Sequence, residues 1–327
     1  MTASLDVSVV VLNYNGVRWL PACLDALAAQ RRPPLETIVV DNGSTDDSAP
    51  LVRRRYPAVR LIETHRNLGY AGGNNAGARS ARGAWLAFLN NDTIPAGDWM
   101  ERLFAHAAAR PDYALVTSRI AFLDDPALID SAGDGYLRAG GAFKHGHHQP
   151  SSRWQQSREV FGACGAAFMI RREVFESLEG FDERFFMVYE DVDLSYRARL
   201  LGHRCWYAAD AVVHHAGSGT MGRMSALAVF HGQRNLEWTW AKNTPWPLVL
   251  TRLPGHLVYS VAGLAHYARH GKLWSALSGK LAAIAGLPAV LRERRRVQSR
   301  RVVKPRDLDA CMERRWLTVK RREKRPG

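Results

Sequence analysis

The first hundred residues alternate short apolar runs with amphipathic segments, and this alternation constrains the fold more than any other feature. Four runs, each nearly continuous in Val, Ile or Leu, are expected to form strands: Val7–Tyr14, Thr37–Asp41, Val59–Thr64 and Ala84–Asn90. Between them, Val17–Ala29 carries apolar residues on one helical face, and Ala71–Ala81 begins another helix. Strands of this composition that alternate with helices are typical of a parallel sheet covered on both faces. The sequence therefore predicts an α/β fold with a mostly parallel sheet flanked by helices.

Polar side chains stand where three of these runs end. Asn13 ends the first run, Asp41 ends the second, and Asn90, Asn91 and Asp92 end the fourth. Ligands of parallel sheets bind beyond the carboxyl ends of the strands, where polar groups meet solvent and ligand. One such residue alone could be a turn former or a helix cap. Three strand ends with the same chemistry favour a ligand site.

The chain has 327 residues, which is enough for one large domain with an appendage or for two domains. Its four cysteines are scattered without a CxxC pair, so we interpret them as thiols in a reducing compartment. The first apolar run lacks a preceding basic region and a cleavage-like site, which indicates a strand rather than a signal peptide. We expect the catalytic region to be cytoplasmic.

The positive charge is confined to one part of the chain. Residues 1–245 hold 26 Lys+Arg and 26 Asp+Glu, whereas residues 246–327 hold 19 and 5, so the tail carries the whole surplus of +14. This asymmetry predicts a boundary between a catalytic domain, residues 1–245, and a basic tail, residues 246–327. Basic tails are typical of proteins that contact nucleic acid or anionic membranes.

The tail also contains two long apolar stretches, Pro245–His270 and Leu273–Leu291. Charged, histidine or proline residues interrupt both, so neither is a clean membrane span: Arg252, Pro254, His256, Lys280 and Pro288. With the adjacent basic runs, they are predicted to be helices that lie in the interface of an anionic membrane. The alternative is a soluble helical appendage that packs on the catalytic domain or forms an oligomer.

An ordered set of motifs carries a family resemblance. In chain order these are VVVLNYN, IVVDNGSTDDS, RNLGYAGGNNAGARSARG, FLNNDT, GACGAAFMIRREVFESLEGFDERFF, YEDVDLSYRARLLG and VVHHAGSGT. The set resembles the family-2 inverting nucleotide-sugar glycosyltransferases of the GT-A fold, and most of all the bacterial rhamnosyltransferases that build cell-surface polysaccharides. The resemblance covers roughly residues 5 to 245 and implies a Rossmann-like GT-A domain followed by a C-terminal helical extension.

The resemblance also implies a reaction and its partners. The chain would move a sugar from a dTDP-, UDP- or GDP-linked donor to a hydroxyl of a glycan or polyprenyl-linked acceptor, with inversion. L-rhamnose from dTDP-rhamnose is the first choice. An acceptor anchored in lipid would explain a peripheral position at the inner face of the cell membrane.

For the nucleotide, the resemblance implies contacts from two strand ends and one loop. Asp41 would contact the base, and Asn13 lies in the same pocket. Arg66 and Asn67 open the loop after the third strand and are placed near the nucleotide, although Arg66 could equally be a surface salt-bridge residue.

For the metal, the resemblance points to FLNNDT. This motif stands where the family has an Asp-x-Asp signature that holds Mg²⁺ or Mn²⁺ against the diphosphate. Asn90 replaces the first carboxylate, so Asp92 is the expected ligand, while Asn90 and Asn91 join the nucleotide pocket. A histidine completes the metal shell in several relatives, and His214 matches that position better than His215.

The catalytic base is expected in the YEDVDLSY motif. In the family a Glu-Asp pair supplies the base, normally its second member, so we predict Asp191 as the base with Glu190 beside it; Glu190 and Asp193 stay open as alternatives. An Asp at this place could also be only a helix cap. The segment GACGAAF borders sugar and acceptor in the family, so Gly162, Ala163 and Gly165 are expected to line that cleft. His145, His147 and His148 are interpreted as solvated loop residues.

Two other classes of function are suggested by single features of the sequence. The basic tail could make the chain a nucleic-acid-binding protein, but no nucleic-acid motif is present and the nucleotide-sugar motifs would be unexplained. An inactive scaffold is favoured only by Asn90, whereas Asp92, Glu190, Asp191 and His214 favour an enzyme.

Overall fold

A mixed sheet forms the centre of the computed structural model, which describes residues 4–217 and 224–323. The strand order is β10-β12-β6-β11-β4-β1-β2-β3, with β5 paired to β12 and β7 paired to β6. The strands are β1 (Leu5–Asn13), β2 (Pro34–Asp41), β3 (Arg60–Glu63), β4 (Trp85–Asn90), β5 (Thr93–Pro95), β6 (Tyr113–Phe122), β7 (Ile129–Ser131), β10 (Arg158–Val160), β11 (Ala167–Arg171) and β12 (Arg204–His215). A separate hairpin joins β8 (Asp134–Tyr136) to β9 (Ala142–Lys144).

The predicted polar strand ends share one edge of this sheet. Strands β1, β2, β3 and β4 run parallel, and the register pairs Asn13 with Asp41 and Leu12 with Asn90. Because parallel strands end at the same edge, these polar residues lie together, as the sequence predicts.

The other half of the sheet departs from a purely parallel arrangement. Strand β11 runs antiparallel to both β4 and β6, and β10 runs antiparallel to β12. Only the pairing of β12 with β6 is parallel there, among the strands that the structure describes. The reversal at β11 brings the GACG segment that precedes it to the same edge as the end of β4.

Helices cover both faces of the sheet, and the alternation of strand side chains shows how. In β1, Val7, Val9 and Val11 belong to one buried core, while Val10 belongs to the core on the opposite face. The first core includes residues of α1 and α4, and the second includes residues of α3, α5 and α6. The bounds are α1 (Leu20–Ala28), α2 (Ser48–Arg55), α3 (Gly69–Ser80), α4 (Trp99–Ala109), α5 (Arg172–Ser177) and α6 (Glu190–Leu200), with short 3-10 turns at Ser151–Trp154 and Glu183–Phe185.

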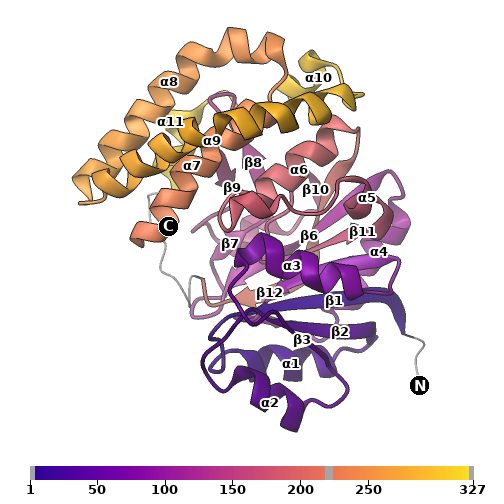
Figure 1. Cartoon of the computed structure of the whole chain (residues 1–327). Helices are drawn as coiled ribbons and strands as arrows, with labels where there is room; N and C mark the ends of the chain where they lie inside the picture. Colours follow the sequence, from indigo (N-terminus) through magenta and orange to yellow (C-terminus); the bar gives the residue numbers. More distant parts are fainter. Residues whose placement is uncertain (1–3, 218–223, 324–327) are drawn as a thin grey trace.

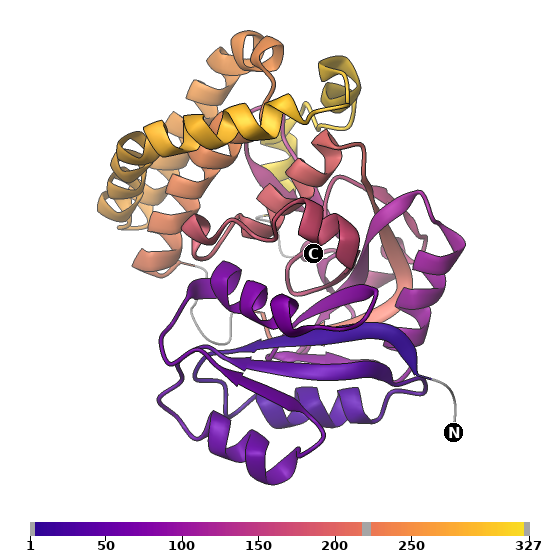
Figure 2. The ribbon, with the colours of Figure 1, turned by 45° about the vertical axis from the view of Figure 1, so that its right-hand side comes forward.

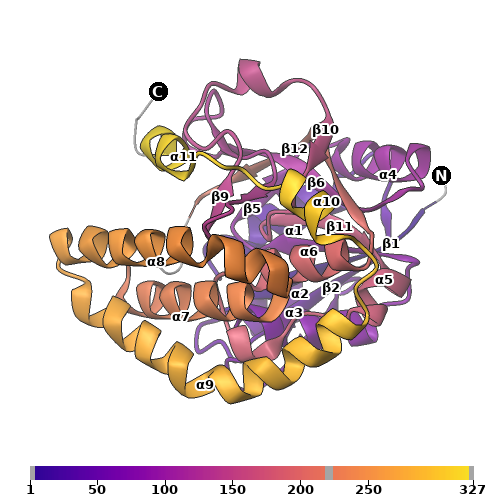
Figure 3. The same ribbon diagram turned by 90° about the horizontal axis from the view of Figure 1, so that it is seen from above.

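The predicted C-terminal helical extension is confirmed as a layer at one end of the molecule (Figures 1 and 2). It comprises α7 (Ala226–Asn243), α8 (Trp246–Arg269), α9 (Leu273–Ser299), α10 (Pro305–Ala310) and α11 (Trp316–Glu323). Helix α7 packs against α9 and against α6 of the sheet domain, and α8 packs against α9 (Figure 3). The expected boundary after residue 245 falls between α7 and α8, so α7 lies on the catalytic side of that boundary in sequence while it packs within the helical layer in space.

Candidate functional site

A cleft of about 530 Å³ opens at the carboxyl edge of the sheet. One wall comes from the ends of β1 and β4, and another comes from the start of α6 and the loop before it. The start of α3, the segment before β11, the hairpin β8–β9 and the end of α11 also line it. The lining includes Leu12, Asn67, Tyr70, Asn90, Asn91, Asp92, Asp134, Lys144, Gly165, Tyr189, Glu190, Asp191, His215 and Glu323. Most of the predicted site residues therefore converge on one cavity.

The strand ends form a buried hydrogen-bonded cluster beneath this cleft. Asn13 is fully buried, and its Nδ2 donates to Asp41 Oδ1 at 3.1 Å and to Ser44 Oγ at 3.2 Å. Its Oδ1 accepts from Asn91 Nδ2 at 2.7 Å. Gly16 makes this contact possible, because a Cβ at that position would overlap both asparagine side chains. Asn91 lines the cleft, whereas Asn13 and Asp41 support it from below.

Arg66 and Asn67 have different positions, although they are adjacent in sequence. Asn67 lines the cleft, and its Oδ1 accepts hydrogen bonds from Asn42 Nδ2 at 3.1 Å and from Gly69 N at 2.8 Å. Arg66 is exposed and is not among the lining residues. The structure therefore places Asn67 at the site and Arg66 outside its wall.

The histidine beside Asp92 is His215, so the prediction that His214 takes this place is wrong. His215 Nε2 lies 3.2 Å from Asp92 Oδ1, and both residues line the cleft. Successive side chains on a strand point to opposite faces, so His214 on β12 points away from the cavity that His215 enters. The end of the motif that carries both residues, 218–220, lies outside the described residues.

Behind His215, a second set of polar groups was missed by the sequence analysis. His215 Nδ1 lies 2.8 Å from Asp130 Oδ2, and Lys144 Nζ donates to both oxygens of the fully buried Asp130 at 3.0 Å. His147, interpreted from the sequence as a solvated loop residue, instead lies with its Nδ1 3.4 Å from Asp130 Oδ1. A row Asp92, His215, Asp130, Lys144 thus lies along the cleft, in which Asp130 is buried behind the wall and the other three residues line the cavity.

The charged forms of His215 and Asp130 stabilise each other. Burial lowers the pKa of His215, but its hydrogen bonds to Asp130 and Asp92 outweigh burial and raise that pKa to about 9. Burial likewise raises the pKa of Asp130, but Lys144, His147 and His215 hold it well below its usual range. The imidazole is therefore a cation between two carboxylates at neutral pH.

Asp191 and Glu190 begin helix α6 and face the cleft. The N-cap is Tyr189, in the left-handed region, so Asp191 is not the cap and its carboxylate is available for other contacts. Asp191 Oδ2 accepts from Gly165 N at 2.8 Å, and Oδ1 accepts from Val192 N at 2.8 Å. These two backbone donors fix the plane of the carboxylate.

Of the three small residues expected to line the cleft, the structure places one there. Gly165 is part of the lining, and a Cβ on it would stand 2.9 Å from Asp191 Oδ2. Gly162 and Ala163 pack instead on Ser195 of α6, whose Oγ accepts from Ala163 N at 3.1 Å. The expectation that all three line the cleft is therefore wrong for Gly162 and Ala163, whose small size serves helix packing.

Asp134 adds a third carboxyl group beside the Glu-Asp pair and was also missed. It is buried, pairs in register with Lys144 across the hairpin, and lines the cleft. Burial raises the pKa of Asp134 well above its usual value, and the charge of Asp191 raises it further. Burial also raises the pKa of Glu190 and Asp191. Three acidic groups with raised pKa values in one cavity are typical of sites for proton transfer.

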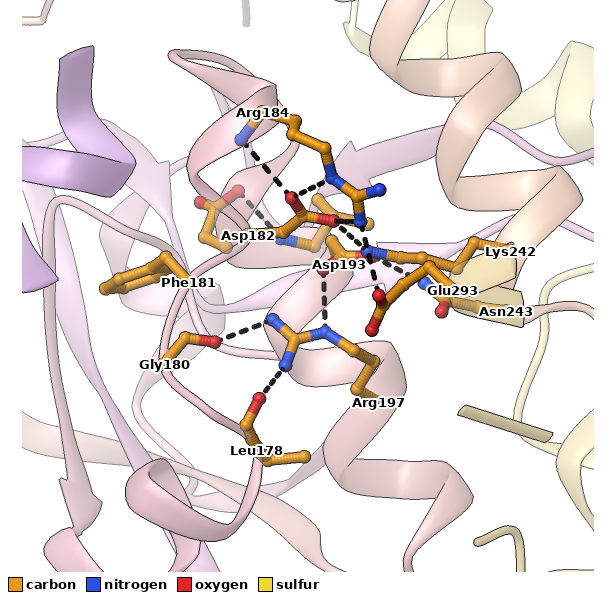
Figure 4. Close-up of polar contacts among 12 residues, drawn as sticks. Leu178, Gly180, Phe181, Asp182, Arg184, Asp193, Arg197, Lys242, Asn243 and Glu293 are labelled. Carbon is orange, nitrogen blue, oxygen red and sulfur yellow. Dashed lines mark hydrogen bonds and ion pairs between the residues drawn. The ribbon is translucent and has the colours of Figure 1, made fainter. Parts of the chain in front are cut away.

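Asp193, the third candidate for the base, lies elsewhere. It is fully buried behind α6, where its carboxylate accepts from Arg197, Lys242 and Asn243 at 2.8 Å (Figure 4). It is not among the residues that line the cleft. Of the three candidates for the base, therefore, only Glu190 and Asp191 line the cleft.

The donor set fits a divalent cation only in part. Among the described residues, no group of three or more His, Cys, Asp and Glu side chains is spaced to hold a metal ion. Asp92 and His215 offer two adjacent donors, which suits a cation that also takes oxygen ligands from substrate phosphates and water. His215 ligates through Nε2 only when deprotonated.

The sequence of the chain is similar to a family model and to known proteins. The family model described as "Glycosyl transferase family 2" matches residues 8–179, which is more than half of the chain. An N-acetylglucosaminyl-diphospho-decaprenol L-rhamnosyltransferase of Mycobacterium tuberculosis is 28% identical over 271 residues, covering 73% of this chain and 88% of the relative.

Solved structures agree at the level of the fold. The mannosyltransferase PcManGT of Pyrobaculum calidifontis, in complex with GDP-Man and Mn²⁺, superposes with a TM-score of 0.55 at 22% identity, covering 95% of this chain and 86% of that chain. TarS of S. aureus, residues 1–349 in complex with UDP, gives a TM-score of 0.54 at 15% identity, covering 86% of this chain and 91% of that chain.

Proposed function

The chain belongs to glycosyl transferase family 2 and has the GT-A fold, and from this premise we propose that it is an inverting, metal-dependent glycosyltransferase of cell-envelope polysaccharide synthesis. One observation carries the proposal. A carboxylate with a raised pKa, Asp191, shares a single cleft with the Asp92–His215 pair and with the polar ends of β1 and β4. These are the parts that transfer from a nucleotide sugar requires: a base, groups near the leaving diphosphate, and a nucleotide pocket.

Asp191 takes the proton of the acceptor. The acceptor hydroxyl attacks the anomeric carbon while the bond from that carbon to the diphosphate breaks, and the proton passes to a carboxylate oxygen of Asp191. The nucleoside diphosphate leaves from the opposite face, so the configuration inverts. Burial raises the pKa of Asp191 toward the operating pH, which makes it a stronger base than an exposed aspartate. Gly165 N and Val192 N hold it in place.

Asn91, Asn67 and Asn90 face the donor, and Asn13 and Asp41 anchor the pocket for its base. Asp92, with His215 after deprotonation, would hold Mg²⁺ or Mn²⁺. The cation supplies positive charge against the diphosphate as the glycosidic bond breaks. Asp130 orients His215 from behind, as carboxylates commonly do for metal-binding histidines.

The donor and acceptor are the finer part of the proposal. L-rhamnose from dTDP-rhamnose is the first choice, with UDP- and GDP-sugars as alternatives, because the family resemblance and the mycobacterial relative both point to rhamnosyl transfer. That relative's name specifies a decaprenol-linked N-acetylglucosaminyl acceptor, so we propose a polyprenyl-linked glycan here.

A lipid-linked acceptor fits the outer face of the helical layer. Within the described residues, α8 and α9 are long and apolar enough to cross a membrane by length and composition. They also carry most of the exposed large apolar side chains: Trp246, Leu250, Leu253, Leu257, Val258, Val261, Leu273, Trp274, Leu281, Ile284, Leu287 and Leu291. We call these twelve residues the apolar face. Exposed arginines at the end of α9, including Arg292 and Arg295, adjoin it.

Polar contacts on the inner side of these helices hold them to α7, which favours docking on the membrane over spanning it. Glu237 of α7 accepts from Ser260 of α8 at 2.8 Å and from Lys280 of α9, and His256 Nε2 lies 2.8 Å from its other oxygen. We call these four residues the interhelical polar cluster. It holds α8 and α9 to α7, with the apolar face outward. We propose that this face lies on the anionic inner surface of the cell membrane.

Donor turnover tests the function. Purified full-length chain is given a panel of dTDP-, UDP- and GDP-sugars with Mn²⁺, Mg²⁺ or EDTA, and the released nucleoside diphosphate is measured with membrane lipid extract as acceptor. Turnover of one donor that requires metal and is lost in Asp191→Asn supports the proposal and names the donor. Failure of every donor to bind or react would make the cleft vestigial and the chain a scaffold.

A further inference from the structure

The segment that leads into Glu190 and Asp191 has a strained backbone. Phe186, Val188 and Tyr189 have φ angles of 63°, 64° and 77°. Non-glycine residues rarely adopt positive φ, and for a β-branched residue such as Val188 it is a genuine outlier. Strain of this kind persists only where the surroundings enforce it. The question is what holds these residues against the cleft.

Helix α7 holds them through one fully buried amide. Asn235 Nδ2 donates to the carbonyl oxygens of Phe185, Met187 and Val188, at 2.9, 2.8 and 2.7 Å. An amide nitrogen has two hydrogens, so three short contacts share them. The side chain thus gathers three carbonyl groups of one strained turn around a single donor.

Arg234 fixes the orientation of that amide and adds two further contacts. Its Nε donates to Asn235 Oδ1 at 2.9 Å, which turns the amide nitrogen toward the turn. Its Nη2 donates to the carbonyl oxygens of Arg184 and Phe185, at 2.8 and 3.0 Å. Five carbonyl contacts from two consecutive residues therefore reach the segment 184–188.

The other end of α7 holds the first turn of α6 itself (Figure 4). Lys242, 1% exposed, places Nζ 2.8 Å from Asp193 Oδ1 and 2.6 Å from Asp182 Oδ2. Asn243 Nδ2 donates to the same Asp193 oxygen at 2.8 Å. Glu190 and Asp191 thus lie between two points that α7 fixes, one before them and one after them.

We propose that Asn235 is a positioning residue of the active site, and that α7 aims the catalytic pair by clamping the turn before it. The inference rests on the proposed function, since it assigns Asn235 to the base that the function requires. Helix α7 lies beyond residues 8–179, the part of the chain that the family model matches. The active site therefore depends on a helix outside that part.

The physical consequence of removing the donor is local. Without Asn235 Nδ2 the carbonyl groups of Met187 and Val188 lose their side-chain donor, while that of Phe185 keeps Arg234 Nη2. The positive-φ residues then relax toward ordinary angles. Glu190 and Asp191 follow directly in the chain, so they shift with the turn. A misplacement of about 1 Å costs roughly 100-fold in rate, whereas the donor contacts on β1 and β4 are unaffected.

The test compares Asn235→Leu, which keeps the volume and removes the donor, with Glu237→Gln as a matched control. Glu237 lies half a turn away on α7, and within the described residues its side-chain hydrogen bonds go to α8 and α9, in the interhelical polar cluster. Amide hydrogen exchange of residues 186–192 is measured on the full-length chain, together with kcat and the donor KM. Asn235→Leu is expected to speed exchange in this segment at least tenfold and to lower kcat by about 30- to 100-fold, with donor KM changed by less than about threefold. Glu237→Gln is expected to leave the exchange rates, kcat and donor KM unchanged.

Arg234→Lys is the second variant, in case Asn235→Leu does not fold. It keeps the charge, loses the guanidinium contacts, and is expected to change exchange and kcat in the same direction but less. Unchanged exchange at 186–192 in both variants overturns the inference, whatever the activity; faster exchange with an unchanged kcat overturns it too. If the wild-type chain turns over no nucleotide sugar, the proposed function fails, while the exchange data still decide whether Asn235 holds the turn.

Discussion

Gly165 donates its backbone N–H to Asp191 Oδ2 at 2.8 Å, across a gap of 26 residues in the chain. The contact joins the segment before β11 to the start of α6. It is possible only with a residue that lacks a side chain, because a Cβ would stand 2.9 Å from the same oxygen. The backbone thus fixes the orientation of the proposed base before any substrate binds.

Asp191→Asn is expected to abolish proton transfer while the donor still binds. An amide cannot accept the acceptor's proton, so kcat should fall by about 10²- to 10⁴-fold. Nucleotide affinity, measured by calorimetry, should change little, since Asn13 and Asp41 lie on other elements. Glu190→Gln is the matched control, and a larger loss in that variant would transfer the role of base to Glu190.

His215→Asn is expected to weaken the binding of the metal ion, whereas His214→Asn is not. The concentration of Mn²⁺ that gives half-maximal activity should rise by at least about 10- to 100-fold for His215→Asn, because loss of even an outer-shell partner of a metal ligand costs that much in affinity. His214 shares the strand but points to the other face. Equal effects of the two substitutions would contradict the placement of His215 beside Asp92.

Asp134→Asn is expected to stabilise the folded chain at neutral and alkaline pH. Burial and the charge of Asp191 raise the folded-state pKa of Asp134 well above 3.8, although Lys144 opposes them. Below about pH 4 the group is protonated in both states. As pH rises, the unfolded state loses its proton first, so the free energy of unfolding falls by about 1.4 kcal/mol per pH unit up to the folded pKa.

The Asp134→Asn variant lacks this loss. Urea unfolding from pH 4 to pH 8 should therefore show equal stability at the acid end and a growing advantage for the variant above it. Parallel stability curves for the two proteins would show that Asp134 does not titrate differently in the folded and unfolded states.

Lys242→Met is expected to be strongly destabilising. Lys242 is 1% exposed and pairs with the fully buried Asp193 and the partly buried Asp182, so its removal leaves each carboxylate with a single arginine partner, Arg197 or Arg184. Because two buried ion pairs are broken, the free energy of unfolding should fall by up to about 3–5 kcal/mol. Arg296→Met is the control: its pair with Glu179 is half exposed on both sides and should contribute less than about 1 kcal/mol.

Leu250→Glu combined with Ile284→Glu is expected to prevent binding to vesicles that contain anionic lipid. Both side chains belong to the apolar face, 71% and 67% exposed, so the change should leave folding intact. Flotation with vesicles of anionic and neutral composition measures the effect. Leu35→Glu, on β2 and 41% exposed, is the control for an added charge elsewhere. Equal binding of all three proteins would contradict the proposed docking face.

The sequence predicts the sheet edge well because its signal is local. Each of β1, β2 and β4 ends in a polar residue that is visible in the sequence, and parallel pairing then brings Asn13, Asp41 and Asn90 together. The antiparallel direction of β11 could not be predicted, since the composition of a buried strand is the same for either direction. The choice between His214 and His215 was also wrong. Successive side chains on a strand point to opposite faces, and the sequence does not show which face of β12 meets the cleft.

Other site residues had no signal that a single sequence could show. Asp130, Asp134 and Lys144 lie in a glycine-rich stretch that resembles a variable loop. The β8–β9 hairpin brings Asp134 and Lys144 to the cleft, and β7 carries Asp130 to its place behind His215. Asn235 is a polar residue at a fully buried position of a helix. A buried polar side chain in a helix signals a specific partner, but which carbonyl groups it meets depends on the backbone of a distant turn.

The interhelical polar cluster limits how this protein can be dissected. A fragment that ends at residue 245 would keep Glu237 but lose His256, Ser260 and Lys280, leaving a carboxylate whose pKa is now held at about 2 without its partners. It would also expose the side of α7 that packs on α9, although α7 is the helix that clamps the active-site turn. Expression fragments and tail exchanges between relatives are therefore best designed with α7, α8 and α9 kept together as one cassette.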